Sequence, residues 1–169
     1  MGRNILILGG ARSGKSSFAE RLAGTMSGKF SYIATAQAFD EEMIDRIARH
    51  QAGRADYWST LECPIDLPSI LDSLAASDNI ILVDCLTLWL SNLMLGDHDI
   101  AAARSALVAT MQRSSATILL VSNEVGQGIV PDNPLARRFR DEAGWLNQAV
   151  AQAADDVWFV TAGLSQRLK

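Results

Sequence analysis

Residues 9–16 read Gly9-Gly10-Ala11-Arg12-Ser13-Gly14-Lys15-Ser16 and match the pattern G-x-x-x-x-G-K-[ST]. An apolar run at 5–8 precedes this stretch, and a segment with a helical apolar face follows it over 15–23. The glycines let successive backbone N–H groups point at an anion, and the helix adds the positive end of its dipole. We expect Lys15 to reach the β- and γ-phosphates of a nucleoside triphosphate and Ser16 to ligate Mg²⁺. The alternative is a chance glycine-rich turn, which the strand before the loop and the helix after it disfavour.

Short apolar segments alternate with helical patterns along the rest of the chain. Strands are predicted at 30–34, 57–61, 80–83, 118–121 and 157–160, the last being the final strand. Helices are predicted at 40–53, with Asp40 as N-cap, and at 65–75, 86–95, 101–113 and 135–154. This alternation predicts one α/β domain over residues 1–169, P-loop NTPase-like, with a mostly parallel sheet and helices on both faces. The 86–95 helix is apolar nearly all round, which fits either the core or a subunit interface.

The composition excludes several classes of protein. The 169 residues are 49% apolar and 20% charged, with a net charge of −4, as in a soluble globular protein. Duplex-binding domains are usually basic, so no nucleic-acid partner is expected. Cys63 and Cys85 have no metal-ligand spacing, which indicates buried thiols in a reducing compartment. We see neither a signal peptide nor an apolar stretch of membrane-spanning length and expect a cytoplasmic protein.

Two acidic residues follow predicted strands. Asp84 comes directly after the strand at 80–83, where a carboxylate that binds Mg²⁺ directly or through water is expected in a phosphate-loop protein. Glu124 follows the strand at 118–121, at the edge where open α/β sheets bind their ligands. Glu124 fits a general base, a metal-water ligand or a substrate acceptor, and it fits a helix or turn cap equally well.

The sequence contains two histidines. His98 lies in the polar stretch at 96–99, where a solvated loop residue is the simple interpretation. His50 follows Ile47 by three positions, near the end of the helix predicted at 40–53. Taken alone, His50 is best interpreted as a partly exposed residue that complements the helix dipole.

A set of motifs along nearly the whole chain changes the interpretation of His50. They are the loop at 9–16, Tyr32-Ile33-Ala34-Thr35-Ala36, Arg46-Ile47-Ala48-Arg49-His50-Gln51-Ala52-Gly53-Arg54, Val83-Asp84-Cys85-Leu86-Thr87-Leu88-Trp89, Ser122-Asn123-Glu124-Val125-Gly126-Gln127-Gly128-Ile129-Val130-Pro131, Arg138-Phe139-Arg140-Asp141 and Ala162-Gly163-Leu164. Together they resemble the bifunctional adenosylcobinamide kinase / adenosylcobinamide-phosphate guanylyltransferase family of cobalamin biosynthesis. The phosphate loop alone is shared by many families, whereas its combination with the His50 segment and the loop after Asn123 is much more specific.

The resemblance implies two linked activities. The chain would phosphorylate adenosylcobinamide with ATP or GTP, and would then transfer GMP from GTP onto adenosylcobinamide phosphate through a covalent intermediate on His50. The resemblance further implies that the guanine nucleotide is contacted by Gln51, Ala52, Gly53 and Arg54, and also by Glu62 and by Ala34, Thr35 and Ala36. It implies Mg²⁺ for both steps and a homotrimer.

Several alternatives remain open at this point. The stretch from 126 to 134 has glycine hinges typical of a lid. Arg137, Arg138 and Arg140 fit phosphate ligands, or a solvated face paired with Asp141 and Glu142. A simple small-molecule kinase with a structural His50 is the second enzyme hypothesis. A GTP-binding switch is a further one, which the absence of an Asn-Lys-x-Asp motif disfavours.

Overall fold

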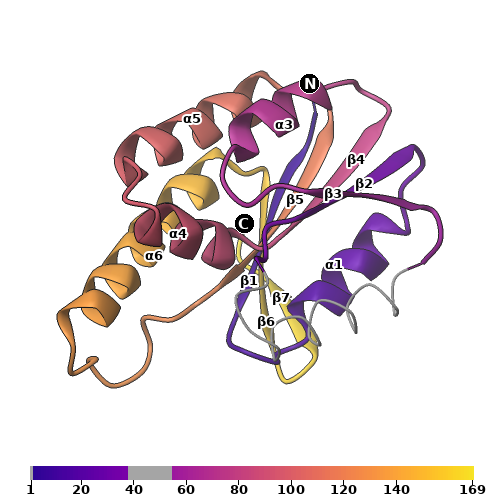
Figure 1. The fold of residues 1–169 in the computed structure, drawn as a ribbon. Coiled ribbons are helices and arrows are strands. Elements are labelled where there is room, and N and C mark those ends of the chain that lie inside the picture. The colour runs from indigo at the N-terminus through magenta and orange to yellow at the C-terminus, as the bar shows by residue number, and fades with distance from the viewer. Residues whose placement is uncertain (1, 38–54) are drawn as a thin grey trace.

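The computed structural model describes residues 2–37 and 55–169. These residues build one seven-stranded sheet with helices packed on its two faces (Figure 1). The strands are β1 (Asn4–Gly9), β2 (Lys29–Ala34), β3 (Trp58–Glu62), β4 (Asn79–Asp84), β5 (Thr117–Asn123), β6 (Asp156–Thr161) and β7 (Leu164–Arg167). The helices are α1 (Lys15–Ala23), α3 (Leu67–Ser73), α4 (Leu86–Leu95), α5 (Ile100–Arg113) and α6 (Pro134–Ala153).

The strand order across the sheet is β3-β2-β4-β5-β1-β6-β7. Strands β1 to β6 are parallel, and β7 pairs with β6 in the antiparallel direction. The carboxyl ends of six strands therefore meet at one edge of the sheet, where open α/β sheets place their ligands. β5 lies between β1, which leads into the phosphate loop, and β4, which ends at Asp84.

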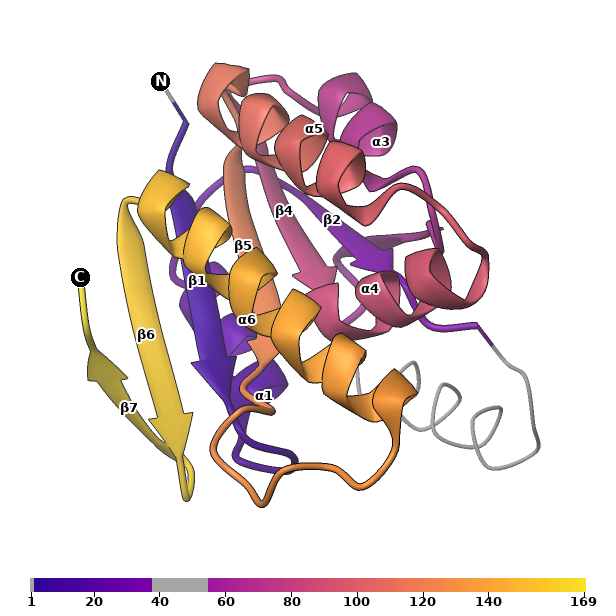
Figure 2. The ribbon, with the colours of Figure 1, turned by 90° about the vertical axis from the view of Figure 1, so that its left-hand side faces the viewer.

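The strands divide their side chains between two hydrophobic clusters, because successive side chains of a strand point to opposite faces. Ile5 and Ile7 of β1 pack in the cluster beneath α1. Leu6 packs in the cluster on the opposite face, together with side chains of α3, α4, α5 and α6. Figure 2 shows these four helices in front of the sheet and α1 behind it. The predicted α/β fold with a mostly parallel sheet and helices on both faces is confirmed.

Local signals in the sequence fix several element ends. α6 begins with Pro134 after Asn133, whose side chain accepts a hydrogen bond from the Ala136 N–H. α5 begins after Asp99, whose side chain accepts from the Ala102 N–H. α4 places Trp89 and Leu90 in the core at 1% and 0% exposure, which confirms the core interpretation of this apolar helix.

The structure differs from the predicted elements at the C-terminal end of the sheet. β7 was not predicted, so the strand at 156–161 is not the last one. The helix expected at 40–53 lies outside the described residues. In the described part of the chain, no helix combines the length and the apolar character that a membrane crossing requires.

Candidate nucleotide site

The phosphate loop lies between β1 and α1, as predicted. Gly14 immediately precedes α1 with a φ of 99°, a left-handed conformation that favours glycine. Lys15 is the first residue of α1 and is 7% exposed, and its Nζ donates a 2.5 Å hydrogen bond to the Gly10 carbonyl. The lysine is thus folded back over its own loop, at the N-terminus of a helix where anions are stabilised. Ser16 is half-buried beside it.

Two neighbouring segments brace this loop. The Gly163 N–H, in the turn between β6 and β7, donates to the Ser13 carbonyl at 2.8 Å. A Cβ on Gly14 would lie 3.3 Å from the Cα of Gly163, so the two turns touch. On the other side the Glu124 N–H, after β5, donates to the Gly9 carbonyl at 3.0 Å. The loop is therefore held by hydrogen bonds from both adjoining strand ends.

Asp84 ends β4 at the same edge of the sheet. Its side chain is half-buried, and Oδ2 accepts a 2.7 Å hydrogen bond from the Tyr32 hydroxyl. Leu82 packs in the cluster beneath α1, and Asp84, two residues later, lies on that same face. With one strand between them, β4 and β1 are roughly 10 Å apart. This spacing suits a carboxylate that acts through a metal-bound water.

The donors at this edge fit Mg²⁺. The ion prefers oxygen ligands, keeps several waters and is commonly held by one or two protein oxygens plus substrate phosphates. Asp84 and Ser16 offer a carboxylate and a hydroxyl of that kind. Among the described residues no cluster of three or more His, Cys, Asp or Glu side chains is arranged to hold a metal alone. The available donors therefore suit an ion that is shared with a nucleotide.

The ends of β2 and β3 complete the edge beyond Asp84. Ala34 pairs with Glu62 of β3 on one side and with Asp84 of β4 on the other, so these three residues form one row. Glu62 is exposed. Thr35 is fully buried, and its hydroxyl donates to the Cys85 carbonyl at 2.7 Å and accepts from the Cys85 N–H at 2.9 Å. The Thr35 side chain therefore holds the end of β4 in place and faces away from solvent.

Similarity to known proteins fits this geometry. Residues 5–168 match the family described as "Cobinamide kinase / cobinamide phosphate guanyltransferase". The chain is 52% identical over 166 residues to the bifunctional adenosylcobalamin biosynthesis protein CobP of Pseudomonas aeruginosa, covering 97% of this chain and 96% of that protein. It is 44% identical over 180 residues to the corresponding CobU protein of Salmonella typhimurium, covering 98% and 99%.

The chain belongs to the cobinamide kinase / cobinamide phosphate guanyltransferase family. The recognition made from the motifs is confirmed. The members of this family are enzymes, so the alternative of a GTP-binding switch is excluded.

Solved structures support the fold of this family member independently. The assembled ATPase EscN from the type III secretion system of enteropathogenic E. coli matches with a TM-score of 0.60 at 11% identity, over 95% of this chain and 43% of that chain. A second solved ATPase domain matches with a TM-score of 0.51 at 13% identity, over 93% and 68%. At such low identity these matches show the P-loop ATPase fold alone.

The polar side chains in and after the loop that follows β5 mostly bind to neighbouring groups of the same region. Glu124 Oε1 accepts a 2.6 Å hydrogen bond from the Gly126 N–H, which is the turn-capping arrangement foreseen as one alternative. Arg137 Nη1 donates to the Pro131 carbonyl at 2.9 Å and so ties the loop to α6. Arg140 lies 3.4 Å from Asp141, whereas Glu142 pairs with Arg104 at 3.3 Å. Arg138 is exposed.

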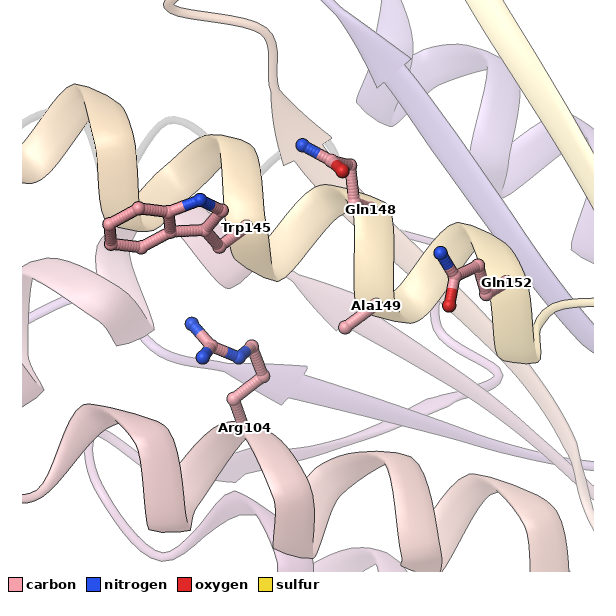
Figure 3. A pocket seen from close by; sticks show the side chains of 5 residues that line it. All are labelled: Arg104, Trp145, Gln148, Ala149 and Gln152. Carbon is pink, nitrogen blue, oxygen red and sulfur yellow. The ribbon is translucent and has the colours of Figure 1, made fainter.

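A shallow groove runs along the outer side of α6, away from the phosphate loop. Figure 3 shows the side chains that line it: Arg104 on α5 points toward α6, which contributes Trp145, Gln148, Ala149 and Gln152. None of these residues was predicted to belong to the site. Trp145 is 53% exposed, and the groove contains no nucleophile.

The remaining predicted residues lie elsewhere. His50 and the four residues after it, 51–54, are outside the described residues. His98 is exposed in the turn after α4. Sequence reasoning gave no role to Tyr32 or Gly163, although both stand in motifs that carried the family resemblance. Their contacts with Asp84 and Ser13 join strands that are distant in sequence, so no local pattern could have revealed them.

Proposed function

We propose that this chain phosphorylates the aminopropanol hydroxyl of adenosylcobinamide with ATP or GTP and then transfers GMP from GTP onto that phosphate, giving adenosylcobinamide-GDP. The observation that carries the proposal is the family match over residues 5–168. It is supported by curated relatives named as bifunctional adenosylcobalamin biosynthesis proteins, which the chain covers almost completely. The phosphate loop, with its buried Lys15, suits both steps because each cleaves a triphosphate.

In the kinase step the loop amides and Lys15 hold the β- and γ-phosphates, and the substrate hydroxyl oxygen attacks the γ-phosphorus while the bond to the β-phosphate oxygen breaks. Ser16 and Asp84 would hold Mg²⁺, which neutralises charge on the phosphates when bound. The N-terminus of α1 adds its dipole to the same charge. Glu124 lies beside the loop at its Gly9 carbonyl. The proton of the attacking hydroxyl leaves to solvent or to a nearby carboxylate.

In the transferase step a neutral imidazole nitrogen of His50 attacks the α-phosphorus of GTP, and pyrophosphate leaves. A phosphate oxygen of adenosylcobinamide phosphate then attacks the same phosphorus, and the phosphorus–nitrogen bond breaks. The phosphoramidate divides one difficult displacement into two easier ones. The resemblance supports contacts from Gln51 to Arg54, from Glu62 and from the turn at 34–36 to the guanine nucleotide.

We further propose an oligomeric state and a cellular location for this protein. The resemblance supports a homotrimer that works in the cytoplasm on small-molecule substrates, without nucleic acid. A sedimentation or light-scattering mass of three times 18.3 kDa is the expected result, and a monomeric mass in the active enzyme would contradict it.

The transferase step is tested by incubating the protein with α-³²P-GTP and Mg²⁺. We expect protein-bound label that is stable to base and labile to acid, and that is lost in His50→Ala. His98→Ala is the matched control, because it removes the chain's other histidine, which is exposed in the described structure. Label that survives in His50→Ala would exclude this residue as nucleophile. Phosphorylation of adenosylcobinamide with no label in the wild type would leave a simple kinase.

A further inference from the structure

Tyr32 lies next to Asp84, the candidate metal ligand at the carboxyl edge of the sheet. It is buried, so it has no open surface through which to contact the nucleotide phosphates. Its side chain is 2% exposed and packs edge-on against Trp58, with ring centroids 5.8 Å apart and planes at 85°. Its hydroxyl donates to Asp84 Oδ2 at 2.7 Å. A buried aromatic ring whose polar end meets a half-buried carboxylate is a fixed hydrogen-bond donor, because the packed ring has little freedom to turn away.

The backbone around Asp84 is fixed by the same strand pair. β2 and β4 pair in register, with Tyr32 opposite Leu82 and Ala34 opposite Asp84. The Thr35 N–H donates to the Asp84 carbonyl at 3.3 Å, and the Thr35 hydroxyl bonds both the N–H and the carbonyl of Cys85. The main chain of Asp84 is thus held on both sides, and rotation of its side chain is the freedom that remains.

We propose that Tyr32 is a positioning residue for the metal step, and that its hydroxyl fixes the rotation of the Asp84 carboxylate so that Oδ1 faces the phosphate loop. The proposal rests on the proposed function, since it takes Asp84 as a metal-water ligand of the kinase and transferase site. The phenol is a neutral donor, so its hydrogen bond orients the carboxylate without cancelling the negative charge that attracts the cation. An arginine in the same place would orient the group and neutralise it.

Tyr32, Asp84 and the start of α1 all lie on the same face of the sheet, which supports this assignment. Tyr32 and Leu82 both belong to the cluster beneath α1, and Asp84 follows on the same face as Leu82. α1 begins with Lys15 and Ser16, so the oriented carboxylate and the predicted metal hydroxyl lie on one side of the sheet. Groups that orient a metal ligand commonly contribute about 10- to 100-fold to metal affinity or activity.

The test is Tyr32→Phe, which removes the hydroxyl and keeps the buried ring. Tyr57→Phe is the matched control, because Tyr57 is the chain's other tyrosine, is 51% exposed and packs against Phe30 in a tilted arrangement with ring centroids 4.8 Å apart. Mn²⁺ replaces Mg²⁺ so that its binding to the GTP-loaded protein can be followed by electron paramagnetic resonance. We expect Tyr32→Phe to weaken Mn²⁺ binding about tenfold, with metal-free GTP binding unchanged, and Tyr57→Phe to match the wild type.

A double-mutant cycle with Asp84→Asn separates positioning from a structural role. If Tyr32 acts through Asp84, Tyr32→Phe adds no further loss of Mn²⁺ affinity in the Asp84→Asn background. Tyr32→Phe with a lowered melting temperature and wild-type Mn²⁺ affinity would overturn the proposal. An Asp84→Asn variant with wild-type Mn²⁺ affinity would overturn it as well. If the wild-type protein acquires no label from α-³²P-GTP, that result counts against the proposed transferase function and does not bear on the role of Tyr32.

Discussion

Lys15 is the residue on which both proposed reactions depend most directly. It is 7% exposed, and its ammonium group bonds the Gly10 carbonyl within the loop that it would share with the phosphates. We expect Lys15→Ala to lower kinase turnover by about 10²- to 10³-fold, because a fixed cation aimed at developing phosphate charge is lost. Lys29→Ala is the control, since Lys29 forms an exposed ion pair with Asp78 on the surface.

The measurements are steady-state phosphorylation of adenosylcobinamide and binding of a fluorescent GTP analogue. The control variant should match the wild type in both. A Lys15→Ala enzyme with full nucleotide affinity and full kinase activity would remove the loop at 9–16 from the site.

Cys85 sits beside Asp84 and is 7% exposed. Burial, with a further contribution from the neighbouring Asp84 charge, raises the pKa of its thiol to about 11. At pH 8 roughly one thiol in a thousand would be ionised, so we expect native Cys85 to resist alkylation by iodoacetamide. After unfolding in urea it should react fully, as mass spectrometry of the Cys85 peptide would show. Stoichiometric alkylation of the native protein would contradict this environment.

The sequence alone identifies those site residues whose position depends only on the neighbouring residues in the chain. The phosphate loop and Asp84 each follow a strand, so their position at the carboxyl edge is predictable from a motif and an apolar run. The partners of these residues are a different matter. Tyr32 is 52 positions from Asp84, and their contact exists because β2 and β4 pair in one particular register.

Among the elements, buried strands and helices were predictable because their apolar patterns are continuous. Helix α1 and helix α4 have the predicted bounds, Lys15–Ala23 and Leu86–Leu95. β7 was missed because all four of its residues are exposed and lack a core-facing pattern. It is an edge strand whose pairing with β6 comes from the tight turn at Ala162 and Gly163.

The turn between β6 and β7 depends on the backbone conformation of Gly163. Gly163 has a φ of 77°, and a Cβ there would meet no atom within 4 Å, so the strain of a substitution comes from the backbone conformation and not from a clash of the Cβ. We expect Gly163→Val, which resists a left-handed conformation, to shift the N–H that bonds Ser13 and to raise the KM for GTP several-fold. Gly163→Asn should stay close to the wild type, because asparagine tolerates this conformation.

Steady-state kinetics with GTP, together with a melting temperature for each variant, separates the two effects. If the valine variant lowers the melting temperature alone and keeps the KM for GTP, the turn stabilises the hairpin without shaping the phosphate loop. A raised KM in both variants would show that the added side chain, and not the backbone, is responsible.

Across the whole molecule the strand order is the feature that sequence could not supply. Alternating strands and helices predict a parallel sheet, but the insertion of β5 between β1 and β4 depends on which helices cover which face. That insertion brings Glu124 next to the phosphate loop and sets Asp84 one strand further away. The arrangement of the site is therefore a consequence of topology as much as of motifs.

Asp156, the first residue of β6, forms ion pairs with Arg3 and Arg167, at the edge of the sheet opposite to the candidate site. It is 2% exposed, and its carboxylate lies 2.6 Å from Arg3 Nε, just before β1, and 2.5 Å from Arg167 Nη2 on β7. The hydrogen bond from Arg3 and the two positive charges hold the pKa of Asp156 below its ordinary value. A lowered pKa means that the folded state prefers the ionised carboxylate, so the stabilisation is present above about pH 4 and is lost as the pH falls further.

We expect Asp156→Asn to reduce the free energy of unfolding by about 1–2 kcal/mol at pH 7, since both arginines are more than half exposed and solvent screens the pair. The difference from the wild type should shrink as the pH falls below about 4, because the unfolded chain then takes up a proton that the folded carboxylate disfavours. Urea is the suitable denaturant, because guanidinium salt would screen the charges. Asp78→Asn, in an exposed pair with Lys29, should change much less at either pH. If the Asp156→Asn deficit stayed constant from pH 7 to pH 3, packing and not charge would account for it.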